Sequence, residues 1–180
     1  MAISSCSKSN SSSSSARILL ANGCVGATAT SLTVNGTNLP NAGSVAYLGN
    51  SGYQGIAPGN VTLNDMLNGV GSLGSLTATL SANASYSVFD CGTVLADSLV
   101  LITDNFPASD ANNAFARLVN VSSDSTATSI TAAVGNNVVG SNIAYGAASG
   151  FVQVTPGSYS ITAFNVNKPG NVATLTELRS

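Results

Sequence analysis

The amino-acid sequence predicts an all-β protein built from two tandem domains, and three observations support this fold class. Segments rich in Val, Ile, Thr, Tyr and Phe are separated by Gly, Asn, Ser and Pro, a composition typical of short strands joined by turns. No stretch longer than about three turns has helical periodicity. The sequence also repeats itself at a fixed separation, as duplicated units do.

The repeat consists of short matches that share an offset of 98 residues. The matched segments are 28–32 with 126–130, 45–47 with 143–145, 51–53 with 149–151, and 58–59 with 156–157. A further match, of residues 16–19 with 116–119, has an offset of 100 and is interpreted as a two-residue slip in a loop. One offset shared by several separate matches indicates two copies of one domain.

Turn signals place the individual strands. Residues 151–155 and 159–164 alternate on either side of Pro156-Gly157. This dipeptide suits a type II turn, because proline presets φ and glycine accepts a positive φ. Asn35-Gly36 is a second hairpin signal. Residues 64–68 are expected to form one short helical turn. Short strands at this spacing indicate a sandwich or a barrel.

The order of these signals resembles that of a known family. In the second copy the signals are Ala116-Arg117-Leu118-Val119, Ile143-Ala144-Tyr145, Ser149-Gly150-Phe151 and Pro156-Gly157-Ser158-Tyr159. They are similar to the bacterial cell-surface family called domain of unknown function 4397, found as tandem immunoglobulin-like repeats behind a lipoprotein signal. The resemblance covers most of residues 16–180, although the first copy departs from the pattern after Pro58-Gly59. It implies two tandem immunoglobulin-like β-sandwich domains and no catalytic residues.

The predicted boundaries are a serine-rich tether or donor segment over residues 1–15, a first domain over 16–108 and a second over 114–180. In the first copy two further apolar runs follow residues 74–80, and they have no counterpart in the second copy. The second domain is therefore expected to lack its last strands. Three explanations stay open: a truncated sequence, a smaller sandwich, or a strand supplied by another chain.

The N-terminal segment and the cysteines suggest an exported protein. Nine of the twelve residues from Ser4 to Ser15 are serine, which is typical of a flexible tether. Ile3-Ser4-Ser5-Cys6 resembles a lipoprotein processing site in which Cys6 is lipidated; the alternative is a serine-rich leader with a chance cysteine.

Lipidation would leave Cys24 and Cys91 as an even pair, expected to form a disulfide if their strands are neighbours. The alternative is two buried free thiols.

Composition excludes several function classes. Charged residues make up 7% of the 180 residues, the net charge is −2, and there is no histidine. Five basic residues are too few for nucleic-acid binding. The apolar runs are too short for a membrane span, so membrane attachment is expected only through Cys6.

Without histidine a Ser-His or Cys-His pair is impossible, and we expect no cofactor and no enzyme. An enzyme would need convergent carboxylates, and Asp90 and Asp97 are the only nearby pair worth checking.

The segment between the two copies contains a weak candidate calcium site. Its oxygen-bearing side chains are Asp104, Asn105, Asp110 and Asn112. Calcium prefers clustered oxygen ligands, but this spacing matches no EF-hand loop. The alternative, which we favour, is a polar linker with a kink at Phe106-Pro107.

Together these observations predict a non-catalytic structural protein at the bacterial surface or outside the cell, assembled into a filament or matrix by β-strand complementation. Its partners are expected to be identical subunits or cell-surface components. Neutral polar strand faces can pack against identical copies without the desolvation of ions. The alternative is a surface lipoprotein module that binds a glycan or a protein at a concave site with convergent polar groups.

Overall fold

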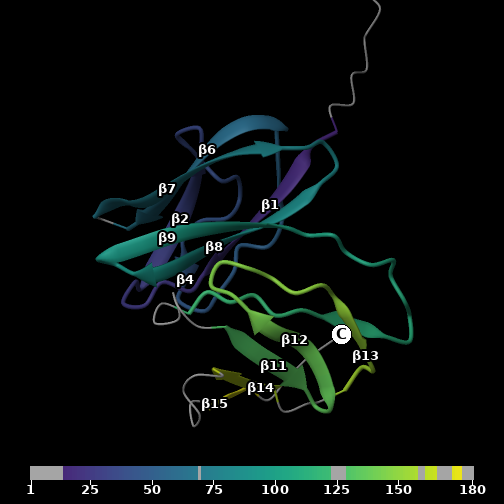
Figure 1. Cartoon of the computed structure of the whole chain (residues 1–180). Helices are drawn as coiled ribbons and strands as arrows, with labels where there is room; N and C mark the ends of the chain where they lie inside the picture. Colours follow the sequence, from purple (N-terminus) through teal and green to yellow (C-terminus); the bar gives the residue numbers. More distant parts are fainter. Residues whose placement is uncertain (1–13, 69, 123–128, 158–160, 166–171, 176–180) are drawn as a thin grey trace, which may run out of the picture.

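The computed structural model of the chain describes residues 14–68, 70–122, 129–157, 161–165 and 172–175 (Figure 1). These residues form strands and turns and contain no helix, so the prediction of an all-β fold is confirmed. Consequently, none of them belongs to a helix long and apolar enough to cross a membrane. The serine-rich residues 1–13, including Cys6, lie outside the described residues.

The N-terminal part of the chain is a β-sandwich of two sheets, drawn in the upper half of Figure 1. The first sheet has the strand order β5-β1-β8-β9, and the second has the order β3-β2-β6-β7 with β4 also paired to β2. The first sheet contains β1 (Ala16–Asn22), β5 (Gln54–Ile56), β8 (Ser85–Thr93) and β9 (Ala96–Thr103). The second contains β2 (Ala29–Val34), β3 (Thr37–Asn38), β4 (Val45–Ala46), β6 (Gly59–Leu67) and β7 (Gly71–Leu80).

The core of this sandwich follows from the alternation of apolar residues along its strands. Ile18 and Leu20 of β1, Leu63 of β6 and Val88 of β8 are all fully buried between the two sheets. Side chains two residues apart share one face of a strand, so each alternating strand contributes one row to the core. Burying such a side chain contributes about 1.5–3 kcal/mol.

The C-terminal part of the chain has two smaller sheets with a second, separate core. One sheet pairs β10 with β13, and the other has the order β12-β11-β14-β15. Ala132, Val134, Val139 and Val154 are buried between them. The strands are β10 (Ala114–Ala116), β11 (Ile130–Val134), β12 (Asn137–Ile143), β13 (Val152–Val154), β14 (Ile161–Asn165) and β15 (Val172–Leu175).

Two local predictions have different outcomes. The Asn35-Gly36 hairpin is confirmed: both residues have positive φ, 51° and 77°, between β2 and β3. The helical turn at residues 64–68 is wrong, because Asn64 to Leu67 belong to β6. Val61, Leu63 and Asp65 are all buried on one face of that strand, so the period is two.

The two copies make the same hydrogen bonds at positions 98 residues apart. The Asn22 side chain donates to the Val45 carbonyl at 2.9 Å, and the Asn120 side chain donates to the Ile143 carbonyl at 2.9 Å. Strand pairing agrees, since the Ala16↔Ile56 pair of β1 and β5 recurs as Ala114↔Val154 of β10 and β13. The match of residues 28–32 with 126–130 is not kept: residues 126–128 lie outside the described residues, and Ile130 has the strand partners that correspond to those of Thr30, not of Leu32.

The two-residue slip is misplaced in the sequence comparison. Ala16-Arg17 corresponds in the structure to Ala114-Phe115, not to Ala116-Arg117. The offset of 100 occurs instead at the hairpin that follows, where the Val34↔Thr37 pair recurs as Val134↔Asn137. The pairing of β11 with β12 carries the register shifts that absorb the two residues.

Candidate functional site

One edge of β10 has no strand beside it among the described residues. β10 pairs only with β13, whereas its counterpart β1 lies between β5 and β8. The β1–β8 pairing is parallel and runs from Arg17↔Ser85 to Asn22↔Asp90. No described strand of the second copy takes the place of β8. This part of the chain therefore has an open edge where the first copy has a paired one.

The backbone just after β10 shows which way this edge faces. The Asn120 N–H donates to the Ala147 carbonyl, and the Leu118 carbonyl accepts from the Ser149 N–H, so both groups point towards residues 147–149. Val119 lies between them, and successive backbone groups of a strand point in opposite directions. The Val119 N–H therefore points to the open edge, where an incoming strand would accept its hydrogen bond.

A groove of about 310 Å³ lies along the open edge. Its apolar lining comes from both sheets of the second copy and includes Ala116, Leu118, Ala132, Val134 and Val139. In the first copy the β8 side chains Tyr86 and Val88 lie at the corresponding level of the core, 6% and 0% exposed. The groove therefore offers an apolar lining to the inward side chains of one further strand.

A buried ion pair links the two copies beside this edge. Asp104 follows β9, and its side chain is fully buried. It accepts hydrogen bonds from Tyr53 Oη at 2.7 Å and Ser87 Oγ at 2.8 Å on one oxygen. Its other oxygen accepts from Arg117 of the second copy, whose side chain is 12% exposed. All three donors stabilise the carboxylate.

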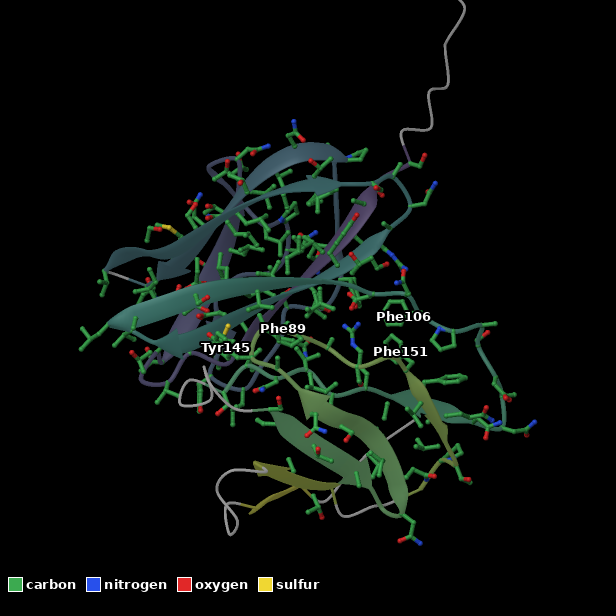
Figure 2. The ribbon with its side chains drawn as sticks, viewed as in Figure 1. Phe89, Phe106, Tyr145 and Phe151 are labelled. Atoms are coloured by element: carbon green, nitrogen blue, oxygen red, sulfur yellow. The ribbon has the colours of Figure 1, made fainter. Side chains whose placement is uncertain are left out.

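Aromatic rings extend the same contact (Figure 2). Phe106 lies between Tyr53 of the first copy and Phe151 of the second, with ring centroids 5.8 and 5.5 Å away. The Arg117 guanidinium lies 4.8 Å from the Phe151 ring centroid, and the Arg17 guanidinium lies 5.6 Å from that of Tyr53. Tyr53 and Phe151 stand at matching positions of the two copies, and Phe106 joins their rings into one contact.

Two of the four calcium candidates, Asp104 and Asp110, have protein partners. Asp104 has its charge balanced by Arg117, so it has no net charge to offer a cation. Asp110 is exposed and accepts from the Asn112 N–H at 2.8 Å and the Asn113 side chain at 2.7 Å, and these bonds lower its pKa. The one group of three Cys and acidic side chains with close ligand atoms found among the described residues contains neither Asp104 nor Asp110.

The predicted disulfide between Cys24 and Cys91 is absent, and both are buried free thiols. The parallel register of β1 and β8 continues through Val25↔Thr93, so Cys91 is level with Gly23 and Cys24 with Gly92. Thiols one register step apart point to opposite faces of the sheet. Cys91 donates to the Ser98 carbonyl at 3.0 Å, and burial raises its pKa to about 11, partly offset by Tyr145 of the second copy.

Cys24 belongs to a polar layer at one end of the N-terminal core. The inward rows of β2, β6, β8 and β9 each have a polar residue at this end: Thr30, Asp65, Asp90 and Asp97. Cys24 follows β1 on the same face. We call Cys24, Thr30, Asp65, Asp90 and Asp97 the acidic cluster. Ligand atoms of Cys24, Asp90 and Asp97 all lie within 4.8 Å of one another.

Burial shifts the ionisation of the acidic cluster. It raises the pKa of Asp90 to about 8, helped by the Asp97 carboxyl and the Asp65 charge. Burial and the charge of Asp97 raise the pKa of Asp65 to about 6. Burial and the same carboxylates raise the pKa of Cys24 to about 12. The cause is common to all three, because a dry site disfavours each negative charge.

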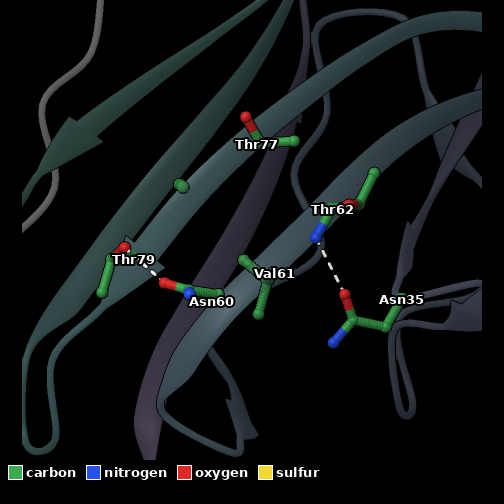
Figure 3. Close-up of a pocket in the computed structure, with 7 residues that line it drawn as sticks. Asn35, Asn60, Val61, Thr62, Thr77 and Thr79 are labelled. Carbon is green, nitrogen blue, oxygen red and sulfur yellow. Dashed lines mark hydrogen bonds between the residues drawn. The ribbon is translucent and has the colours of Figure 1, made fainter.

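A second, polar groove lies on the outer face of the N-terminal sandwich, over β6 and β7 (Figure 3). Its volume is about 540 Å³, and amide and hydroxyl groups line it. Asn60 accepts from Thr79 Oγ1 at 2.6 Å, and the Asn35 side chain accepts from the Thr62 N–H at 2.8 Å. The groove presents neutral hydrogen-bonding groups to solvent.

Sequence reasoning found only part of these sites. It noted Asp90 and Asp97 as a nearby pair, which the structure does bring together, but it missed Cys24 and Asp65 as their neighbours. The usable signal was the alternation of Val61, Leu63 and Asp65, which places a carboxylate in an inward row.

The sequence of the chain matches a protein family. The family model described as a domain of unknown function (DUF4397) matches residues 16–131, which span the first copy and the start of the second. A search of curated proteins finds no match.

Proposed function

The chain belongs to the DUF4397 family, whose description names no activity. From the open edge of β10 we propose that the protein is a non-catalytic structural protein of the bacterial surface or extracellular space. Its two copies are tandem immunoglobulin-like β-sandwich domains. Chains assemble into a filament or matrix when a strand of another copy pairs with β10 and fills the groove.

The single observation that carries this proposal is the difference between β1 and β10. The same strand, with the same register to its neighbour, is paired on both sides in the first copy, whereas in the second copy the described residues pair with it on one side only. Backbone hydrogen bonds give strand addition its affinity, and the groove gives side-chain specificity. The donor is residues 2–15 of another copy, and parallel pairing would imitate the β1–β8 pair.

Composition supports assembly of identical chains. With 7% charged residues, two copies can approach without strong like-charge repulsion or costly desolvation of ions. The Asp104–Arg117 ion pair and the Phe106 contacts hold the two copies of one chain together, so a subunit would behave as a short rigid unit. Lipidation of Cys6 would instead attach a chain to the membrane and withdraw its donor segment.

The molar mass of the full chain in solution tests the proposal. We expect it to rise with concentration in light-scattering measurements, and a variant without residues 2–13 to stay monomeric. Val119→Pro removes the N–H that points to the open edge, so it should also stay monomeric, whereas Val119→Ala should assemble. A full chain that is monomeric at every concentration would exclude assembly.

A ligand-binding module is the second candidate, and the polar groove over β6 and β7 favours it. Asn35, Asn60 and Thr79 offer neutral donors and acceptors of the kind that bind sugar hydroxyls. Binding of glycans to the wild-type chain but not to Asn60→Ala, with Asn68→Ala as a control outside the groove, would support this function.

A further inference from the structure

We propose that Cys24, Asp90 and Asp97, at one end of the N-terminal core, bind a divalent metal ion of the zinc type. These residues come from three separate elements: the segment after β1, β8 and β9. Their ligand atoms lie within 4.8 Å of one another. Ligand atoms around a tetrahedral zinc ion are on the order of 3.5 Å apart, so a small side-chain movement closes the site.

Independent evidence comes from buried polar atoms that lack partners. Both carboxylate oxygens of Asp65, Asp90 and Asp97, and Thr30 Oγ1, have no hydrogen bond of ordinary geometry to the described residues. Thr30, Asp65 and Asp90 are each 0% exposed. The Thr30 hydroxyl faces Asp65 and Asp90, whose pKa values it lowers. So many unsatisfied buried oxygens in one place need an explanation, and a bound cation supplies one.

The positive charge is not supplied by an arginine of the described residues. Arg17 donates to Ser85 and lies over Tyr53, while Arg117 pairs with Asp104. Three carboxyl groups and a thiol thus share a buried space without a described cation. Buried charges in proteins are normally paired or bound to metals.

The strands that the two copies share lack the acidic residues in the second copy. By strand register, Ile130 takes the place of Thr30 and Ala163 takes the place of Asp65. Ser122 takes the place of Cys24, because the Ser122 N–H bonds to Asn120 as the Cys24 N–H bonds to Asn22. These shared strands therefore do not require Cys24, Thr30 and Asp65, whereas Asp90 and Asp97 lie on β8 and β9, which have no counterpart among the described strands of the second copy.

The presence of a sulfur ligand selects the class of metal. Calcium and magnesium take oxygen ligands, whereas zinc accepts thiolate and carboxylate together. Binding would release the proton of the Cys24 thiol, and that of any protonated carboxyl group, to solvent. The affinity should therefore rise with pH.

Backbone packing fits a fixed position for Asp97. A Cβ on Gly74 would lie 2.3 Å from Asp97 Oδ2, so only glycine at this position of β7 leaves room for the carboxylate as it is placed. Asp97 is partly exposed as a residue, although both of its carboxylate oxygens are buried. An ion would reach the site from this side.

The test uses the full chain with Cys6→Ser, to remove a competing thiol, after treatment with a chelator. Zinc binding is measured by titration against a competing chelator, and cobalt is used as a spectroscopic probe. We expect one ion per chain and a thiolate-to-cobalt charge-transfer absorption. Cys24→Ser should abolish that absorption, and Cys91→Ser, which changes the thiol on the opposite face, should retain it.

Asp97→Asn keeps the size of its side chain and should lower zinc affinity by at least about tenfold. Circular dichroism shows whether each variant is folded, and Asp90→Asn provides a second folded ligand variant. The proposal is overturned if the folded chelator-treated chain binds no zinc, or if calcium binds in preference to zinc. It is also overturned if the charge-transfer absorption survives Cys24→Ser.

Discussion

Asn22 and Asn120 occupy equivalent positions in the two copies, and each donates its side-chain N–H to a backbone carbonyl 23 residues later, at 2.9 Å. Each also accepts from the N–H two residues later, at 3.1 and 3.2 Å. Both residues are buried, 2% and 1% exposed. One buried amide in each copy therefore ties the end of β1, or the segment after β10, to the backbone carbonyl of Val45 or Ile143.

Replacing either asparagine should weaken its own copy. Asn22→Ala and Asn120→Ala each leave a buried carbonyl and a buried N–H without these bonds, at a cost of about 1–3 kcal/mol. Because the hydrogen bonds match, we expect the two variants to lose similar free energies of unfolding. Urea unfolding measures each loss, and hydrogen exchange shows which copy is weakened. A loss for only one variant would contradict the equivalence of the two positions.

The Arg117–Asp104 ion pair should be the most sensitive contact between the copies. Arg117→Ala leaves the fully buried Asp104 carboxylate with only Tyr53 and Ser87 as donors. Removing one partner of a buried pair costs about 3–5 kcal/mol. Chemical denaturation of the variant measures this loss.

Arg17→Ala is the matched control for that experiment. Arg17 also lies over an aromatic ring, but it donates to the neutral Ser85 hydroxyl. Arg17→Ala should therefore lower the free energy of unfolding by less than Arg117→Ala does. Adding Asp104→Asn to Arg117→Ala should recover part of the stability, because it removes the uncompensated charge. Equal costs for the two arginines, with no recovery, would refute a special role for the pair.

The acidic cluster gives the metal-free chain an unusual pH dependence. Burial raises the pKa of Asp90 to about 8 from 3.8, and that of Asp65 to about 6 from 3.8. Between the ordinary pKa of 3.8 and these raised values, the folded state binds more protons than the unfolded state. Stability is therefore greatest below about pH 4 with respect to these groups, and falls as pH rises towards 8.

Thermal unfolding in the presence of a chelator measures this effect. The melting temperature should fall between about pH 4, near the ordinary carboxyl pKa of 3.8, and about pH 8, the pKa of Asp90 in the fold. Asp90→Asn should flatten the curve, because the amide has no proton to lose. A wild-type curve that rises over this range, or one unchanged in Asp90→Asn, would show that Asp90 is ionised in the fold.

The fold class was predictable because it depends on local patterns. Alternating residues and the Asn35-Gly36 turn specify strands and hairpins within a few neighbours. The position of the two-residue slip was not predictable, because Ala-Arg recurs by chance at Ala116-Arg117 while the register follows Ala114-Phe115. Pairing between strands decides the register, and sequence similarity over two residues does not.

The acidic cluster was predictable only in part. Asp90 and Asp97 are close because β8 and β9 form one hairpin. Cys24 joins them because β1 is paired with β8 in the same sheet, and Asp65 joins them because the other sheet packs on this one; residue spacing reveals neither. The absent Cys24–Cys91 disulfide was expected because residue spacing does not reveal strand register either. The strands are neighbours, but the register turns the thiols to opposite faces.

The open edge of β10 is the basis of the proposed assembly, and amide hydrogen exchange at Val119 tests it most directly. In the concentrated full chain we predict slow exchange of the Val119 N–H, because a strand of another copy accepts its hydrogen bond. Dilution, or removal of residues 2–13, should make that exchange fast. Fast exchange of the Val119 amide in the concentrated full chain would contradict strand addition at this edge.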